Sequence, residues 1–192
     1  MKTKVHIEVP GGAEKILLHA CCAPCSGAIV ECLMERGITP VIFYSNSNIF
    51  PREEYGHRLE ECLRYARKWG VGFVEDAYEH EAWKRCALGL EAEPERGRRC
   101  LNCFRYRLLR AAQYASAHGF TLLSTTLAAS RWKSLEQVDQ AGRWACSQVE
   151  GVGWWAQNWR KGGLQERRNQ IIREENFYNQ LYCGCEYSQR GA

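Results

Sequence analysis

The sequence predicts an α/β fold in which helices flank both faces of a single parallel β-sheet. Short apolar runs of strand length alternate with longer segments whose apolar residues recur with helical spacing. The connections between these segments are short, and such strand–helix alternation is typical of parallel sheets. At 192 residues the chain has the size of one domain with a substantial core. We therefore treat 1–192 as a single domain.

The first elements of the chain begin the alternation. Residues 15–20 (KILLHA) form an apolar run that predicts a buried strand, and apolar residues spaced helically after Ser26 predict a helix that Gly37 ends. Residues 41–44 (VIFY) predict the second strand, and a polar loop follows at 45–48.

The next elements repeat this pattern. They are a helix at about 53–69, a strand at 71–74, a helix at 79–90, a charged loop at 91–99, a helix at 103–118 and a strand at 120–127. Beyond Leu127 the pattern is less regular, so we interpret 128–188 as a C-terminal extension that wraps the core at 15–127. The result is a Rossmann-like (HUP-like) domain, in which ligands bind at the C-terminal ends of the strands.

Cysteine is the most informative residue type in this chain. The N-terminus lacks the apolar stretch of a signal peptide, and no apolar run approaches the roughly 18–20 residues that span a bilayer, so we expect a cytoplasmic protein without a membrane partner. In a reducing compartment, clustered cysteines indicate metal or redox chemistry. Seven of the eleven form three clusters, which are Cys21, Cys22 and Cys25, then Cys100 and Cys103, then Cys183 and Cys185. The isolated ones, Cys32, Cys62, Cys86 and Cys146, are interpreted as small buried hydrophobic residues.

The first two clusters fit an iron–sulfur centre. The two-residue spacing of Cys100 and Cys103 lets both thiolates bind one metal centre, and a helix N-terminus there favours thiolate. Adjacent cysteines at 21 and 22 strain to share one zinc, whereas a cubane offers separate irons. Four such thiolates would supply the ligands of a 4Fe–4S cluster, with structural zinc as the alternative. Cys25 could face the same centre or a second metal.

The third cluster suggests electron transfer. Gly184 permits the tight backbone that brings Cys183 and Cys185 together, and such a pair can ligate metal or cycle between dithiol and disulfide. The sequence contains no GxGxxG, GxxxxGK[ST] or SGGxDS motif. We therefore expect electrons to come from an external one-electron donor rather than from a bound nicotinamide or flavin.

Basic and aromatic residues indicate a nucleic-acid partner. The net charge of +4 is small, but basic residues concentrate at 96–110 and 160–173, and five of the seven tryptophans fall at 132–159. This mixture suits loop RNA, where bases stack and phosphates pair, although a solvated basic face is the alternative. Trp144 and Trp154 are expected in the core, and the candidates for RNA contact are Trp132, Trp155 and Trp159.

Polar residues at predicted strand ends and in a basic loop are candidate substrate contacts, although hydroxyl groups there could also bind only loop backbone. These candidates are Asn48, Thr125, Thr126, Arg160 and Lys161. His19, within the first strand, is interpreted as a core histidine with satisfied hydrogen bonds.

Together these residues resemble the QueH family of epoxyqueuosine reductases over about 15–188. The motifs that carry the resemblance are HACCAPC at 19–25, NIFP at 48–51 with Glu54, Tyr55 and Arg58, RCLNCF at 99–104 with Arg107 and Leu108, STTL at 124–127 with Ser130 and Lys133, WRKGG at 159–163, and YNQLYCGC at 178–185. The chain departs from the family pattern at 130–133 and at 158–161, which affects substrate contacts rather than the cysteine site.

The resemblance implies reduction of epoxyqueuosine to queuosine at the wobble position in the anticodon loop of tRNA, with the epoxide oxygen lost as water. It implies a 4Fe–4S cluster held by Cys21, Cys22, Cys100 and Cys103. It also implies an additional iron or other divalent metal with Cys25 as a ligand. The pair at Cys183 and Cys185 would be a redox-active centre that forms a disulfide.

Three other functions are alternatives to this one. A 4Fe–4S sulfonucleotide reductase also combines adjacent cysteines with CxxC, but it needs a nucleotide-binding phosphate loop and a lone C-terminal nucleophilic cysteine. A tRNA sulfur transferase is disfavoured by the missing ATP loop. A non-catalytic, zinc-stabilised RNA-binding module needs only the basic and aromatic residues.

Overall fold

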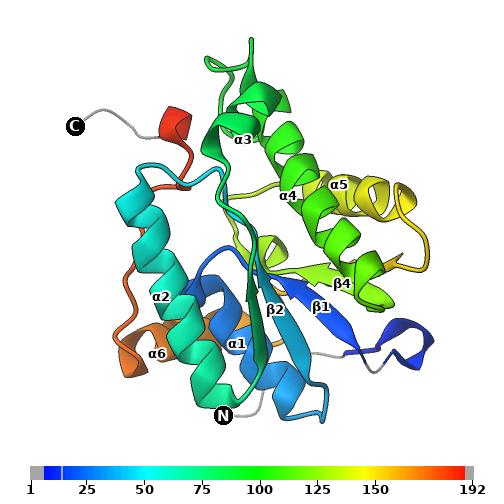
Figure 1. Ribbon diagram of the computed structural model, residues 1–192. Coiled ribbons are helices and arrows are strands. Elements are labelled where there is room, and N and C mark those ends of the chain that lie inside the picture. The colour runs from blue at the N-terminus through cyan, green and yellow to red at the C-terminus, as the bar shows by residue number, and fades with distance from the viewer. Residues whose placement is uncertain (1–6, 14, 189–192) are drawn as a thin grey trace.

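The computed structural model describes residues 7–13 and 15–188, and it is built around one sheet (Figure 1). Five parallel strands run in the order β3-β2-β1-β4-β5. Their bounds are β1 Ile16–His19, β2 Pro40–Tyr44, β3 Gly72–Glu75, β4 Leu122–Thr125 and β5 Gly153–Trp154. The predicted α/β class with a parallel sheet is confirmed.

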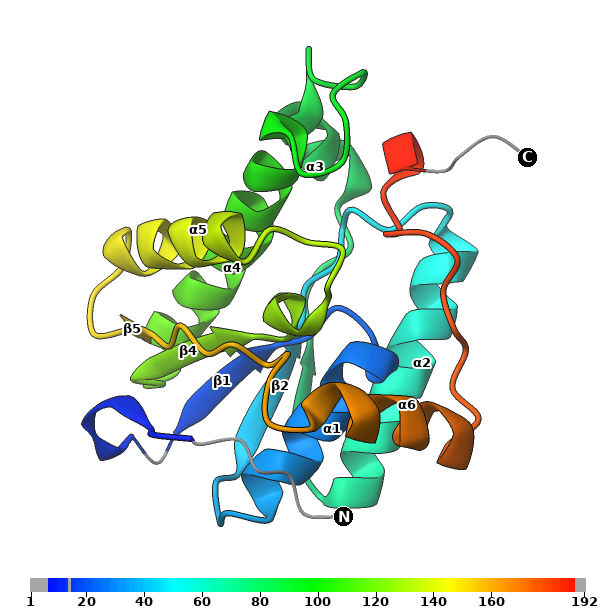
Figure 2. The same cartoon turned by 180° about the vertical axis from the view of Figure 1, so that it is seen from behind.

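Helices cover both faces of the sheet (Figures 1 and 2). On one face lie α1 Ala23–Met34, α2 Arg52–Trp69 and α6 Leu164–Glu174, and on the other lie α4 Arg98–Ala117 and α5 Leu135–Ser147. The short α3 His80–Ala87 packs against α4. Single 3-10 turns complete the list, η1 Pro10–Gly12, η2 Thr126–Ala129 and η3 Glu186–Ser188.

Local sequence explains the central elements. All four residues of β1 are buried because helices cover both sides of this strand, which accounts for its uninterrupted apolar run. Helix α2 ends where Gly70 takes up a left-handed conformation with a φ of 65°, a common way for helices to stop. Its first turn carries acidic residues and its last turn basic ones, as the helix dipole favours.

Two helices begin earlier than the sequence predicted. Helix α1 begins at Ala23 rather than at Ser26, so Cys22 is its N-cap and Cys25 lies in its first turn. Helix α4 begins at Arg98 rather than at residue 103, so Cys100 lies in its first turn. Both cysteine clusters are therefore held by helix N-termini.

The segment after Leu127 is more regular than the sequence predicted. It supplies α5, α6 and the edge strand β5, which pairs with β4. The backbone N–H of Trp155 continues this ladder by donating to the carbonyl of Leu123 at 2.9 Å. Trp155 and Trp159 are consequently buried against each other, with 3% and 1% exposed, so the expectation that they contact RNA is wrong.

The order of the strands creates a topological switch point. The chain moves outward from β1 through β2 to β3, then returns to place β4 on the other side of β1. Ligand sites in such sheets lie at the C-terminal ends of the strands that flank this point. Within the described residues, no helix is both long and apolar enough to cross a membrane.

Candidate functional site

A cavity of about 1370 Å³ lies beside the C-terminal ends of β1, β2 and β4. Cysteines from all three sequence clusters line it, namely Cys21, Cys22, Cys25, Cys100, Cys103, Cys183 and Cys185. The fold thus brings together thiols from the N-terminus of α1, the N-terminus of α4 and the C-terminal end of the described chain.

The sulfurs of Cys21, Cys22 and Cys25 form the tightest group, within 4.8 Å of one another. The Cys21 and Cys22 sulfurs are 3.8 Å apart. Hydrogen bonds from the thiols of Cys22 and Cys25 lower the pKa of Cys21 well below its usual range. Three thiols at this spacing can hold a metal ion.

Thr126, the first residue of η2 directly after β4, holds Cys21 in place. Its Oγ1 accepts a hydrogen bond from the Cys21 backbone N–H at 3.1 Å and donates one to the Cys21 sulfur at 3.4 Å. Thr126 is fully buried, so it contacts the cysteine rather than the cavity space.

The second cluster comes from the first turns of α4. The backbone N–H of Arg96 donates to the Cys100 sulfur at 3.3 Å. Cys103 lies in a small apolar cluster with Trp83 and Cys185, and partly buried Cys86 packs against it. Burial raises the pKa of the Cys103 and Cys100 thiols. Cys86 is thus half-buried beside two other cysteines, whereas Cys32, Cys62 and Cys146 are buried as predicted.

The third cluster lies on residues 177–188, which we call the C-terminal strap. Arg58 on α2 donates from Nη2 to the carbonyl of Tyr182 and from Nη1 to that of Cys183, both at 3.2 Å. The Phe50 backbone N–H donates to the Gly184 carbonyl at 2.8 Å. These contacts hold the backbone of the cysteine pair on both sides of Gly184.

The Arg58 guanidinium is itself held in place. It forms an ion pair with Glu54 at 2.6 Å, and both residues are buried. The Tyr178 hydroxyl donates to the other oxygen of Glu54 at 2.9 Å. Arg58 therefore links α2 to the strap through an ion pair that is itself buried.

Cys183 and Cys185 have different surroundings. The Lys133 ammonium lies 3.3 Å from the Cys183 sulfur. Burial alone would raise the pKa of Cys183, but the positive charges of Lys133 and Arg107 outweigh it, and the pKa lies below its usual value. Burial raises the pKa of Cys185 to about 12, and the neighbouring Cys103 adds to the effect. Both thiols are free in the structure.

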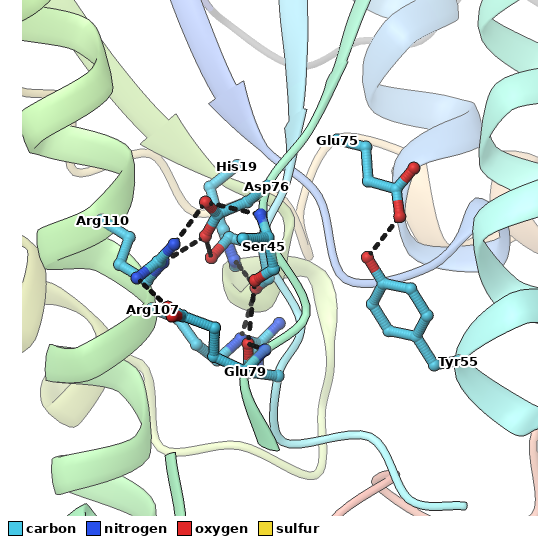
Figure 3. A network of polar contacts seen from close by, with 10 residues as sticks. His19, Ser45, Tyr55, Glu75, Asp76, Glu79, Arg107 and Arg110 are labelled. Atoms are coloured by element: carbon cyan, nitrogen blue, oxygen red, sulfur yellow. Dashed lines mark hydrogen bonds and ion pairs between the residues drawn. The ribbon is translucent and has the colours of Figure 1, made fainter. Parts of the chain in front are cut away.

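A polar network behind the cavity orients Arg107 (Figure 3). Its Nε donates to the Ser45 carbonyl at 3.1 Å, and its Nη2 donates to Asn46. The Ser45 hydroxyl donates to Asp76 at 2.6 Å, and Asp76 pairs with Arg110. The loop after β2 thus holds the guanidinium of Arg107, and Asp76 on the loop after β3 holds that of Arg110.

His19 shares this network and is neutral. Its Nε2 lies 3.2 Å from the Ser45 carbonyl, and its Nδ1 lies 2.7 Å from the Thr125 hydroxyl. Burial, with the charge of Arg107, lowers the pKa of His19 to about 3. The interpretation of His19 as a core histidine with satisfied hydrogen bonds is confirmed.

The lining of the cavity is strongly cationic. Nine arginine and lysine residues contribute to it, against one acidic residue, Glu95. Among the described residues, only Arg58 of these nine forms an ion pair. These cations would therefore offset the negative charge of thiolates, or of an anionic ligand, inside the cavity.

The predicted substrate residues fall in different places. Asn48 and Arg160 line the cavity, and the buried Oδ1 of Asn48 has no hydrogen-bond partner among the described residues. Thr125 is buried and hydrogen-bonded to His19. Lys161 is exposed and lies outside the cavity lining.

Arg107 and Arg58 were not among the site residues predicted from sequence. Their spacing along a helix could have identified both as site residues from the sequence. Arg107 follows Cys103 by four positions, which places the two on one face of α4, and Arg58 follows Glu54 by four positions on α2.

The family model and the curated relatives that match this chain carry the same family name. The family model for epoxyqueuosine reductase QueH matches residues 16–191. A curated relative of that name from Histophilus somni (strain 129Pt) is 46% identical over 184 residues, covering 96% of this chain and 76% of the relative. The namesake from Acinetobacter baylyi is 44% identical over 189 residues, covering 98% and 87%. That from Thermotoga maritima is 31% identical over 176 residues, covering 90% and 89%.

Proposed function

The chain belongs to the QueH family of epoxyqueuosine reductases, and on this basis we propose that it reduces epoxyqueuosine to queuosine at the wobble position of tRNA. One observation supports the assignment of this reaction to the cavity. Seven cysteines from three distant segments line it, at the end of the sheet where ligands bind. We place the reaction in the cytoplasm, where free thiols persist.

The donor set suits an iron–sulfur centre. Soft thiolates are the ligands that such clusters prefer, and the cavity lining holds five of them outside the strap with a single carboxylate. We assign Cys21, Cys22, Cys100 and Cys103 to a 4Fe–4S cluster, and Cys25 to an additional iron or other divalent metal. When bound, this centre would supply single electrons and a Lewis acid for the epoxide oxygen.

Cys183 and Cys185 match the stoichiometry of the reaction. Converting an epoxide to an alkene and water consumes two electrons and two protons. Oxidation of two thiols to a disulfide releases two electrons and two protons. The pair can therefore balance one turnover, after which an external donor must reduce the disulfide.

The cationic lining suits the RNA. The cavity of about 1370 Å³ exceeds the volume that most small ligands need, so a nucleoside can enter it. The wobble nucleoside lies in an unpaired loop and can be turned outward without melting a helix. We assign contacts with this nucleoside to Asn48 and Arg160, because both line the cavity.

Anaerobic purification and nucleoside analysis test the proposal. We expect a brown protein with about four or more irons per chain, which forms queuosine from epoxyqueuosine-containing tRNA and a reductant. Cys21→Ala should abolish the colour and the turnover, whereas the matched variant Cys32→Ala, a buried cysteine of α1, should retain both. A colourless protein with one zinc, or an iron-replete protein that forms no queuosine, would contradict the proposal.

A further inference from the structure

Two large apolar side chains stand exposed at the cavity. Trp132 has 65% of its surface exposed and Leu181 has 93%, and both line the cavity. Trp132 lies on residues 130–133, between η2 and α5, and Leu181 lies on the C-terminal strap. Being both exposed and part of the lining, they lie at the opening.

The position of Trp132 is fixed by its neighbours. The Arg96 side chain donates to the carbonyls of Trp132 and Arg131 at 3.0 and 3.3 Å. The Gln137 amide donates to the carbonyl of Arg96 at 2.8 Å. The Arg131 guanidinium lies over the indole ring, 4.9 Å from its centroid. The exposed ring is therefore presented on a braced loop.

Leu181 is fixed through the backbone on either side. Tyr178 is anchored by its backbone N–H to Glu61 at 2.9 Å and by its hydroxyl to Glu54. Tyr182 is anchored by Arg58 at its carbonyl and by Phe50 at its hydroxyl. The segment between these anchors holds an almost fully exposed leucine beside the cavity.

The charge around these two residues indicates the chemistry of the partner. Arg96, Arg131, Arg168 and Arg173 also line the cavity, and none of them forms an ion pair within the described residues. Apolar and aromatic surface among unpaired cations suits unstacked bases on a phosphate backbone. A neutral or basic protein surface would not match this charge.

We propose that Trp132 and Leu181 contact the two bases that flank the modified nucleoside, with Trp132 stacking on one and Leu181 acting as a wedge against the other. This inference rests on the proposed function, because a nucleoside that enters the cavity leaves its neighbours at the opening. Aromatic rings support stacked bases, and leucine can separate base steps. The surface thus separates the target nucleoside from the stack.

Binding of RNA tests the surface without reference to turnover. The probe is a fluorescent anticodon hairpin, and the readout is the dissociation constant from anisotropy at fixed salt. Trp132→Ala should weaken binding roughly 5- to 100-fold, whereas Trp132→Phe should retain most of the affinity. Leu181→Ala should also weaken binding, but Leu88→Ala should not, because Leu88 is 78% exposed yet lies outside the cavity lining.

Abasic hairpins identify the contact. If Trp132 stacks on a flanking base, removing that base should weaken binding by wild type and leave Trp132→Ala unchanged. Equal affinity of wild type and Trp132→Ala for the intact hairpin would overturn the proposal. So would a Trp132→Ala defect that appears only as a raised KM for a protein electron donor. Failure of the proposed reaction would show separately, as wild type that binds the hairpin but forms no queuosine.

Discussion

The Nη1 atom of Arg58 donates a hydrogen bond to the carbonyl oxygen of Cys183 at 3.2 Å, joining α2 to a residue 125 positions later. The same guanidinium forms a buried ion pair with Glu54. The backbone of the cysteine pair therefore depends on a charge network that belongs to another part of the fold.

Loss of this guanidinium should destabilise the protein. Arg58→Gln leaves Glu54 buried without its cation, which costs about 3–5 kcal/mol when one partner of a buried pair is removed. Urea unfolding measures the loss. Arg64→Gln on the same helix is the control, because its side chain is 49% exposed, and such surface pairs contribute about 0–1 kcal/mol. Equal losses for the two variants would contradict the role of Arg58.

The charge on Lys133 should make Cys183 the more reactive thiol of the strap. Its pKa lies below the usual value, whereas that of Cys185 is raised to about 12. Lys133→Met should move the pH profile of Cys183 alkylation to higher pH, with about a tenfold slower rate at neutral pH for each unit of pKa. Peptide mass spectrometry after timed iodoacetamide treatment resolves the two cysteines. The rate at Cys185 serves as the internal reference, and an unshifted Cys183 profile would refute the idea.

Gly184 should not tolerate a side chain. Its φ is 105°, and an added Cβ would lie 2.9 Å from Ile49 and 3.0 Å from the Arg58 guanidinium. Gly184→Ala should therefore lower both stability and turnover, with a backbone cost of about 1–2 kcal/mol before any clash. Gly119→Ala supplies the control, because its φ is 71° and no atom lies within 4 Å of the added Cβ. If thermal unfolding gave the two variants the same loss of stability, the added Cβ at position 184 would cause no costly clash, and the prediction would be wrong.

Burial of neutral His19 should make folding pH-dependent. Its pKa is about 3 in the folded chain against a usual value of 6.5. As the pH falls, the imidazole of His19 therefore takes up a proton in the unfolded state before it does so in the folded state. The contribution of His19 to the free energy of unfolding is complete above about pH 6.5 and falls as the pH drops toward 3, by about 1.4 kcal/mol per pH unit. Urea midpoints across this range measure the slope. A His19→Gln variant should show a shallower slope, and an identical one would assign the effect to other groups.

The sequence was sufficient for the elements whose patterns are local. The apolar run of β1 and the glycine after α2 defined their boundaries, and parallel pairing then placed the cysteines at the end of the sheet. Strand β5 was missed because two residues, Gly153 and Trp154, carry no period-two pattern. Its assignment depends on pairing with β4, a long-range contact. The burial of Trp155 follows from the same pairing.

The candidate site shows a similar limit. Spacing along the sequence placed seven cysteines in three clusters. All seven line one cavity, which agrees with their selection as site candidates. The half-buried position of Cys86 beside Cys103 and Cys185 arises from the packing of α3 on α4, which no spacing reveals. The partners of Arg107, Ser45 and Asn46, lie on the loop after β2, about 60 positions earlier in the chain, so the orientation of its guanidinium depends on a long-range contact.

The strap borders the cavity yet is the last described part of the chain to leave the ribosome. The sheet and the helices that carry the other five cavity cysteines are all synthesised before residue 177. The cysteines at the N-termini of α1 and α4 can therefore be in place before Cys183 and Cys185 are made, and contacts of the strap with α2 then complete the cavity lining. Assembly of this cavity would follow the direction of translation, with Cys183 and Cys185 added last.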